Sequence, residues 1–122
     1  MSSHDIMKEV MKYRKIDTHM HAKTPHFESM IDIGDRLGIQ KMVMVNHAYP
    51  PFGGMDTYRA INDIAIAAVK QHPERFIGYF TLNPNYPRES LEEMKRCLDQ
   101  GLIGYKGYTE VKISDPLYYP II

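Results

Sequence analysis

Short runs of branched apolar residues alternate along this chain with longer segments of helical periodicity, and this alternation limits the possible folds. The predicted strands begin near residues 15, 40, 76 and 102, so successive starts lie about 25 to 36 residues apart. Parallel strands need a long crossover between them, and a helix usually provides it. We therefore predict an α/β fold with a mainly parallel sheet built from four βα units.

Four such units amount to half of a (β/α)₈ barrel, which typically has about 250 residues. We expect a parallel (β/α) barrel-type fold that is half of a TIM-like barrel, with residues 1–14 as an N-terminal extension and residues 15–122 as the half-barrel. Such a sheet leaves an edge and an apolar face uncovered. The apolar end, residues 117–122, looks like a truncation, so we expect more chain, a second copy in a homo-oligomer, or a rearranged packing to cover them.

Residues that typically start or end helices stand at the expected boundaries of these elements. The expected strands cover residues 15–19, 40–46, 76–82 and 102–108. Gly38 and Gly101 stand where helix C-caps belong, Pro73 ends the helix predicted over 56–72, and Asp115 with Pro116 has the chemistry of a helix start.

Helical periodicity predicts which side of each helix is apolar. The first helix has Met30, Ile33 and Leu37 on one face, and the third directs Leu91, Met94 and Leu98 inward. The buried stripe of the second helix is expected to consist of Ala60, Ile61, Ile64, Ala65 and Ala68. The wetter faces of the third helix are expected to carry Glu92, Glu93, Lys95 and Arg96, while Cys97 is expected to be buried and unreactive.

Composition excludes several classes of protein. Fifteen Lys and Arg residues balance fifteen Asp and Glu residues, so no net field attracts nucleic acid or an anionic membrane. Cys97 is the single cysteine and cannot form an internal disulfide. There is no apolar secretory segment at the N-terminus and no run long enough to span a membrane. We expect a cytoplasmic protein that acts on a small molecule.

Asp17, His19 and His21 end the first predicted strand. Alternate side chains of a strand point to the same side, so the two histidines have Cα atoms about 6.6 Å apart and can share one ion. Catalytic zinc takes nitrogen ligands and keeps a position for water, and barrel active sites form at the carboxyl ends of the strands. The alternative is two unrelated histidines in a polar loop.

The stretch KIDTHMHA resembles the first-strand signature of the amidohydrolase superfamily, and QHPERFIGYFTLNP and GLIGYKGYTEVKISDPLYYPII are similar to later parts of one of its branches. That branch contains the aminocarboxymuconate-semialdehyde decarboxylase-like proteins. The resemblance covers the chain from about Lys15 to Ile122 and implies metal-dependent chemistry on a (β/α)₈ barrel. It matches His19 and His21 to two metal ligands and Asp17 to the acidic residue that supports them.

The resemblance implies a divalent metal, with zinc expected and manganese as the alternative. The family takes its other ligands from later strands, whose positions are absent here. Lys106, on the fourth predicted strand, has a weak match to a carboxylated lysine that bridges two metals in some branches, and it is otherwise a barrel-interior or substrate-facing cation.

Other polar residues follow the predicted strands. His47 is a second catalytic candidate beside Lys106, and Asn83 and Glu110 are substrate-binding candidates. Each has a plainer interpretation: His47 as a loop histidine and Asn83 before Pro84 as a turn residue. The aromatic loop 49–54 is either a lid or a surface excursion.

Three functional hypotheses remain open. The first is a metal-dependent hydrolase in which activated water attacks a carbonyl-type substrate, with nonoxidative decarboxylation as an alternative on the same fold. The second is a phosphoesterase of the polymerase and histidinol phosphatase type, disfavoured because Asn46 stands where its pair with His47 needs an acid. The third is a noncatalytic half-barrel or a truncated fragment.

Overall fold

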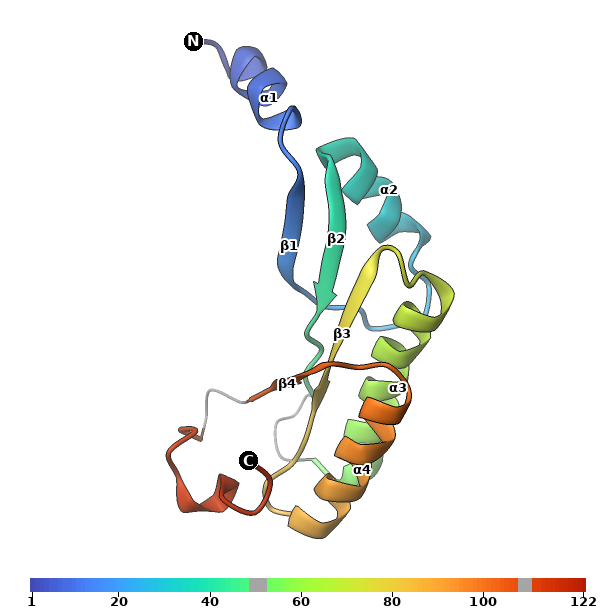
Figure 1. Cartoon of the computed structure of the whole chain (residues 1–122), viewed down its shortest axis with the longest axis vertical. Helices are drawn as coiled ribbons and strands as arrows, with labels where there is room; N and C mark the ends of the chain where they lie inside the picture. Colours follow the sequence, from blue (N-terminus) through green and yellow to red (C-terminus); the bar gives the residue numbers. More distant parts are fainter. Residues whose placement is uncertain (49–52, 108–110) are drawn as a thin grey trace.

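The computed structural model describes residues 1–48, 53–107 and 111–122. In this part of the chain one sheet has its strands in sequence order, and every neighbouring pair is parallel (Figure 1). The strands are β1 (Lys15–Met20), β2 (Ile39–Met44), β3 (Phe76–Thr81) and β4 (Gly104–Lys106). The predicted parallel α/β architecture is confirmed, and β4 is shorter than expected.

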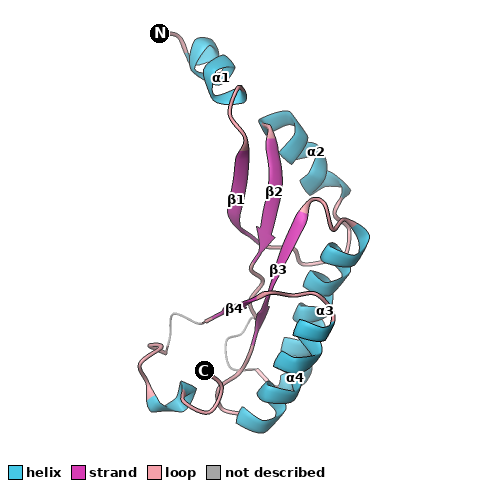
Figure 2. Cartoon of the chain, viewed as in Figure 1, coloured by secondary structure: helices cyan, strands magenta, loops and turns pink. Residues whose placement is uncertain are grey.

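Three helices cover one face of this sheet (Figure 2). They are α2 (Glu28–Leu37), α3 (Met55–Gln71) and α4 (Pro87–Asp99). A barrel has its helices outside and its strand carboxyl ends at one mouth, so this arrangement is half of such a barrel. The expectation of a half-barrel is confirmed.

Two shorter elements lie at the ends of the chain. The helix α1 (Ser3–Met11) begins with a capping box between Ser2 and Asp5, buries no residue, and lies beyond the start of β1 (Figure 1). Near the other end a 3₁₀ turn, η1 (Pro116–Tyr118), follows Asp115, whose side chain accepts a hydrogen bond from the backbone N–H of Leu117. The predicted helix start is therefore present as a single capped turn.

Gly38 confirms the predicted end of α2. Its φ of 68° lies in the left-handed region, and its N–H donates to the carbonyls of Asp35 and Gly34. A residue with a Cβ adopts this conformation only at an energetic penalty. The chain turns there directly into β2.

The hydrophobic core fills the space between the sheet and the three helices. Met42 and Met44 from β2 and Phe76 and Phe80 from β3 are buried in it. Cys97 is also buried, as predicted. The remaining buried members are Phe27, Ala65, Ile66, Ala68, Leu82, Leu102, Tyr118 and Ile121.

The predicted apolar face of α2 is confirmed only at Met30, which packs against the core. Ile33 is 55% exposed and Leu37 is 41% exposed, whereas Gly34 is buried. A Cβ on Gly34 would lie 3.2 Å from Arg75 Nη2 and 3.5 Å from Met42 Sδ. The helix therefore approaches β2 through its glycine, and this close contact turns Ile33 and Leu37 outward.

The apolar face predicted for α4 is likewise confirmed only at Met94, which packs against the core. Leu91 is 46% exposed and Leu98 is 50% exposed, while Glu93, expected on a wetter face, is only 1% exposed. Glu93 and Arg96 pair with polar side chains of α3, and these pairings decide which side of α4 faces inward.

The stripe predicted for α3 is partly confirmed. Ala65 and Ala68 are buried and Ile61 and Ile64 partly buried, but Ala60 is exposed. The buried face also includes Tyr58, Asn62 and Ile66, which the prediction left out.

The apolar C-terminal segment is divided between core and surface. Tyr118 and Ile121 are buried, whereas Tyr119 and Ile122 are exposed. Among the described residues, no helix has the length and hydrophobicity needed to cross a membrane.

Candidate functional site

Three histidines lie together where β1 and β2 end. His19 belongs to β1, His21 follows that strand, and His47 follows β2. The ring centroids of His19 and His21 are 4.9 Å apart, those of His21 and His47 are 5.0 Å apart, and the ring planes of both pairs meet at 83°. The structure therefore brings one catalytic candidate, His47, beside the two predicted metal ligands.

Asp17 supports this cluster from within β1. Its Oδ1 accepts a hydrogen bond of 2.9 Å from the backbone N–H of His19. The carboxylate thus fixes the backbone that carries the first imidazole. Asp17 therefore lies beside His19, as a residue that supports a metal ligand would. Its role toward a metal stays a prediction.

The surroundings of His21 favour the neutral imidazole. Partial burial lowers the pKa of His21, repulsion from His47 and His19 lowers it further, and Lys106 adds a smaller repulsion. A hydrogen bond involving the backbone of Val45 opposes these effects. A neutral imidazole has the nitrogen lone pair that a metal requires, so these charges keep His21 ready to act as a ligand.

The donor set agrees only partly with a catalytic metal site. His19 and His21 offer two ring nitrogens, the ligand type that zinc accepts. Across residues 1–48, 53–107 and 111–122, however, no group of three or more His, Cys, Asp or Glu side chains is arranged to hold a metal. Since catalytic zinc usually has three protein ligands, the described residues supply part of such a site.

A cavity of about 340 Å³ lies beside the histidines. His21 and His47 form part of its lining together with Lys23 and Asn46. Ala22, Ile61 and Ile64 provide its apolar wall. The cavity thus places polar groups from the ends of β1 and β2 opposite an apolar surface of α3.

Asn46, which the sequence suggested only as a replacement for an acid, has a structural role. Its Oδ1 accepts a hydrogen bond of 2.7 Å from the backbone N–H of Ala22. Its position just after a buried strand was the available signal, because polar residues at the carboxyl ends of barrel strands often serve the site. Lys23 was missed as well, and its distance from the His-x-His motif is only two residues.

Lys106 approaches the site from β4. It pairs with Thr81 of β3, and the Thr81 hydroxyl donates to the Lys106 carbonyl at 3.3 Å. Its charge acts on the pKa of His21, so the fourth strand brings this candidate toward the histidine cluster. Whether Lys106 bridges metals or faces substrate stays a prediction.

Asn83 is buried in the loop after β3, where its side-chain amide forms hydrogen bonds with the backbone. Its Nδ2 donates to the Gly53 carbonyl at 2.8 Å, and its Oδ1 accepts from the backbone N–H of Asn85 at 3.0 Å. These bonds agree with the turn interpretation. Glu110 and residues 49–52 of the predicted lid lie outside the described residues, so their predictions stay as made.

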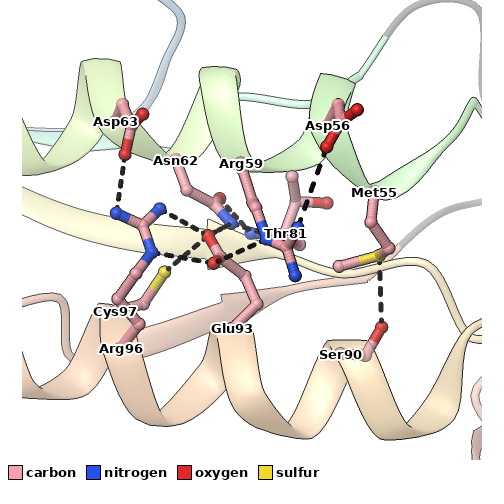
Figure 3. Close-up of polar contacts among 10 residues, drawn as sticks. All are labelled: Met55, Asp56, Arg59, Asn62, Asp63, Thr81, Ser90, Glu93, Arg96 and Cys97. Carbon is pink, nitrogen blue, oxygen red and sulfur yellow. Dashed lines mark hydrogen bonds and ion pairs between the residues drawn. The ribbon is translucent and has the colours of Figure 1, made fainter.

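A buried polar network connects α3, α4 and the end of β3 (Figure 3). Asn62 forms two hydrogen bonds with the backbone of Thr81, the last residue of β3. Its Oδ1 accepts from the Thr81 N–H at 2.9 Å, and its Nδ2 donates to the Thr81 carbonyl at 3.0 Å. The same Nδ2 donates to Glu93 at 2.9 Å. The network thus determines where β3 ends.

Glu93 is the centre of the network. Burial raises its pKa, but hydrogen bonds from Arg96, Asn62 and Cys97 outweigh burial, so the pKa lies below the ordinary value. Arg96 binds both carboxylate oxygens, at 2.7 and 2.8 Å, and also pairs with Asp63 at 2.8 Å. Burial and the adjacent Glu93 raise the pKa of the Cys97 thiol to about 12, which makes it a poor nucleophile.

Comparison with known proteins identifies what this arrangement resembles. The chain is 31% identical over 83 residues to 2-amino-3-carboxymuconate-6-semialdehyde decarboxylase of Dictyostelium discoideum, a match that covers 65% of this chain and 23% of that protein. It shares 26% identity with a solved 5-carboxyvanillate decarboxylase from Novosphingobium aromaticivorans, with a TM-score of 0.62 over 80% of this chain and 30% of the other. The chain resembles the amino-terminal half of amidohydrolase-superfamily proteins.

More distant structures support the fold of this amidohydrolase-like half-barrel. A Staphylococcus aureus protein described as an amidohydrolase aligns with a TM-score of 0.73 at 20% identity, over 89% of this chain and 43% of that one. The 2,6-dihydroxybenzoate decarboxylase from Rhizobium aligns with a TM-score of 0.67 at 18% identity, over 88% and 44%. No family model matches the chain. The chain spans less than half the length of each of these relatives.

Proposed function

We propose that this chain provides the first two ligands of a divalent-metal site that acts on a small carbonyl or carboxylate compound. The carrying observation is the pair of exposed imidazoles, His19 and His21, whose rings lie 4.9 Å apart at the carboxyl end of β1. The amidohydrolase-like fold supports this assignment, since barrel active sites form at this end of the strands.

The chain's own residues have defined parts in this proposal. His19 and His21 hold the ion through ring nitrogens, and Asp17 fixes the His19 backbone. The bound metal would supply polarisation of a carbonyl group and a water of lowered pKa. Zinc is the proposed metal and manganese the alternative, which gains support from the manganese in the 5-carboxyvanillate decarboxylase structure.

Hydrolysis and nonoxidative decarboxylation are both proposed reactions for this fold. Hydrolysis follows from the family-level resemblance. Decarboxylation is favoured by a specific observation, namely that three of the relatives described above are decarboxylases by name. The two proposals differ in product, because only decarboxylation releases CO₂.

We further propose that activity requires a closed barrel in a homo-oligomer. The described residues offer two proposed metal ligands, His19 and His21, and no group of three or more. The chain covers 43% of the S. aureus relative. Two half-barrels related by twofold symmetry can close an eight-stranded ring and bring both pairs of histidines to one mouth. A half-barrel that does not close is the alternative, noncatalytic hypothesis.

Metal binding tests the proposal. We expect the purified chain to bind about one zinc or manganese ion per site in metal analysis and native mass spectrometry. The double variant His19→Ala/His21→Ala should lose that metal, because it removes both proposed ring ligands. His26→Ala is the matched control, since His26 is also an exposed histidine but lies outside the cluster.

Two results would contradict the metal site: a metal-free wild-type chain after incubation with excess zinc and manganese, or equal metal content in the wild type and the double variant. If metal is retained, assays for CO₂ release and for ester, lactone and amide hydrolysis distinguish the two reactions.

A further inference from the structure

Within residues 1–48, 53–107 and 111–122, the side-chain nitrogen of Asn46 lacks a hydrogen-bond partner. Asn46 is only 3% exposed, and among the described residues its Nδ2 has no acceptor. Buried polar groups are almost always paired, so an unpaired donor needs an explanation. Asn46 is also one of the residues that line the cavity beside His21 and His47.

The orientation of the Asn46 amide follows from the hydrogen bond that its Oδ1 accepts. The backbone N–H of Ala22 is a donor and lies 2.7 Å from Oδ1, so that atom must be the oxygen. The nitrogen is consequently the unpaired atom. An amide nitrogen cannot bind a metal ion through a lone pair in this state, and it can pair only with a hydrogen-bond acceptor.

The rest of the cavity indicates which acceptor fits. Lys23 brings a positive charge, and His21 and His47 bring further nitrogen groups. No acidic side chain of the described residues lines the cavity. An anionic oxygen is therefore favoured over a neutral or cationic group. The apolar side chains of Ile61 and Ile64 lie in the same lining and suit a hydrocarbon body attached to that oxygen.

We propose that Asn46 is a specificity-determining residue that donates a hydrogen bond from Nδ2 to a carboxylate oxygen of a small apolar acid. The inference rests on the proposed function because it assigns the substrate class of the same site. In this proposal the backbone N–H of Ala22, in the loop after β1, orients the Asn46 amide so that Nδ2 faces the ligand.

The Asn46→Asp variant tests the role of the donor. Aspartate keeps an oxygen for the Ala22 N–H but loses the NH₂ group. If Asn46 served only to hold Ala22, this change would leave the binding of a carboxylate intact apart from the added charge. Gln71→Glu is the control for a charge added elsewhere on the chain, because Gln71 is exposed and does not line the cavity. Asn46→Ala removes the donor without adding a charge.

The probe is benzoate, with benzyl alcohol as the neutral comparison. We expect benzoate to shift the Asn46 side-chain NH₂ signals of the wild-type chain in ¹H–¹⁵N NMR spectra, and benzyl alcohol to leave them unchanged. Both Asn46 variants should bind benzoate about tenfold more weakly or worse, since a hydrogen bond to a charged group is lost. Gln71→Glu should retain wild-type affinity.

The inference is overturned if benzoate does not bind, if it binds without shifting the Asn46 NH₂ signals, or if Asn46→Ala remains folded and binds benzoate as the wild type does. The NMR shift on the wild-type chain needs no variant to fold. Zinc binding is measured separately on the same samples. Loss of benzoate binding with zinc binding intact therefore rejects only this inference, whereas benzoate binding without zinc binding rejects the proposed metal site.

Discussion

Glu93 shows how one buried carboxylate can organise a whole region. Its side chain receives hydrogen bonds from Arg96, Asn62 and Cys97, and Asn62 in turn holds the end of β3. The residue lies three positions before Arg96 on α4, so the ion pair forms within one helix and then binds a second. Local pairing and tertiary packing coincide at this position.

Removal of the Glu93 carboxylate should strongly destabilise the fold. We expect Glu93→Ala to lower the free energy of unfolding by about 3–5 kcal/mol, because Arg96 loses its buried partner and Asn62 loses an acceptor. Urea denaturation monitored by circular dichroism measures the change. Asp99→Ala, which removes only the exposed pair with Lys95, should change it by less than about 1 kcal/mol. Equal effects of the two variants would refute a central role for the network.

Glu93 also predicts a dependence of stability on pH. Its pKa in the folded chain is below the ordinary value of 4.5, so the unfolded chain binds the proton more tightly. The stabilisation is complete above pH 4.5 and is lost as the pH falls through the lower, folded-state pKa.

Denaturation of Glu93→Gln across the acidic range tests this dependence. The variant should show a smaller loss of stability than the wild type as the pH falls through that window, since glutamine does not titrate. An identical pH profile for the two proteins would contradict the prediction.

Residue-scale prediction succeeded where local spacing decides the outcome. The two-residue spacing of His19 and His21 on a strand was enough to predict that their rings lie together, and the rings do. The approach of His47 and the burial of Glu93 depend on how neighbouring units pack. Spacing along the chain holds no information about that packing, so the network was missed and Asn46 was weighed only as a substitute for an acid.

At the scale of elements, the order of strands and helices could be predicted, but the rotation of the helices could not. Helical periodicity correctly located α2 and α4 and put Ile33 and Leu98 on the wrong side. Gly34 in α2 and the Glu93 pairings in α4 decided the rotation through close contact and charge. Helical periodicity considers only the spacing of apolar residues, so it takes account of neither the close contact at Gly34 nor the charge pairing of Glu93.

Gly78 tests how closely β3 and the segment before β4 approach each other. A Cβ there would lie 2.4 Å from Leu102 Cδ2 and 3.1 Å from Val69 Cγ1, and Leu102 is buried. We expect Gly78→Ala to destabilise the protein by about 1–3 kcal/mol through overpacking. Thermal unfolding measures the loss, with Gly54→Ala as the control, since nothing lies within 4 Å of its Cβ position. Stability equal to the wild type in Gly78→Ala would show that the core yields more easily than its packing indicates.

At the scale of the whole molecule, the helices on one face of the sheet expose several large apolar side chains. Ile33, Leu37, Leu91 and Leu98 are all at least two-fifths exposed on α2 and α4. Large exposed apolar surface generally marks an interaction site. This surface agrees with the proposed association of copies.

Association should therefore depend on concentration. We expect sedimentation equilibrium to show a species of twice the chain mass of 14.2 kDa at micromolar concentration, dissociating on dilution, because mass action governs the assembly. The thermal midpoint should rise with protein concentration for the same reason. A monomer at every concentration, with an unchanging midpoint, would reject the homo-oligomer.

The in-order sheet also gives the folding chain a direction. Each strand pairs with the one that precedes it in sequence. The three histidines of the cluster, His19, His21 and His47, lie within the first 47 residues. A chain emerging from the ribosome therefore has all three of these imidazoles before β3 is synthesised.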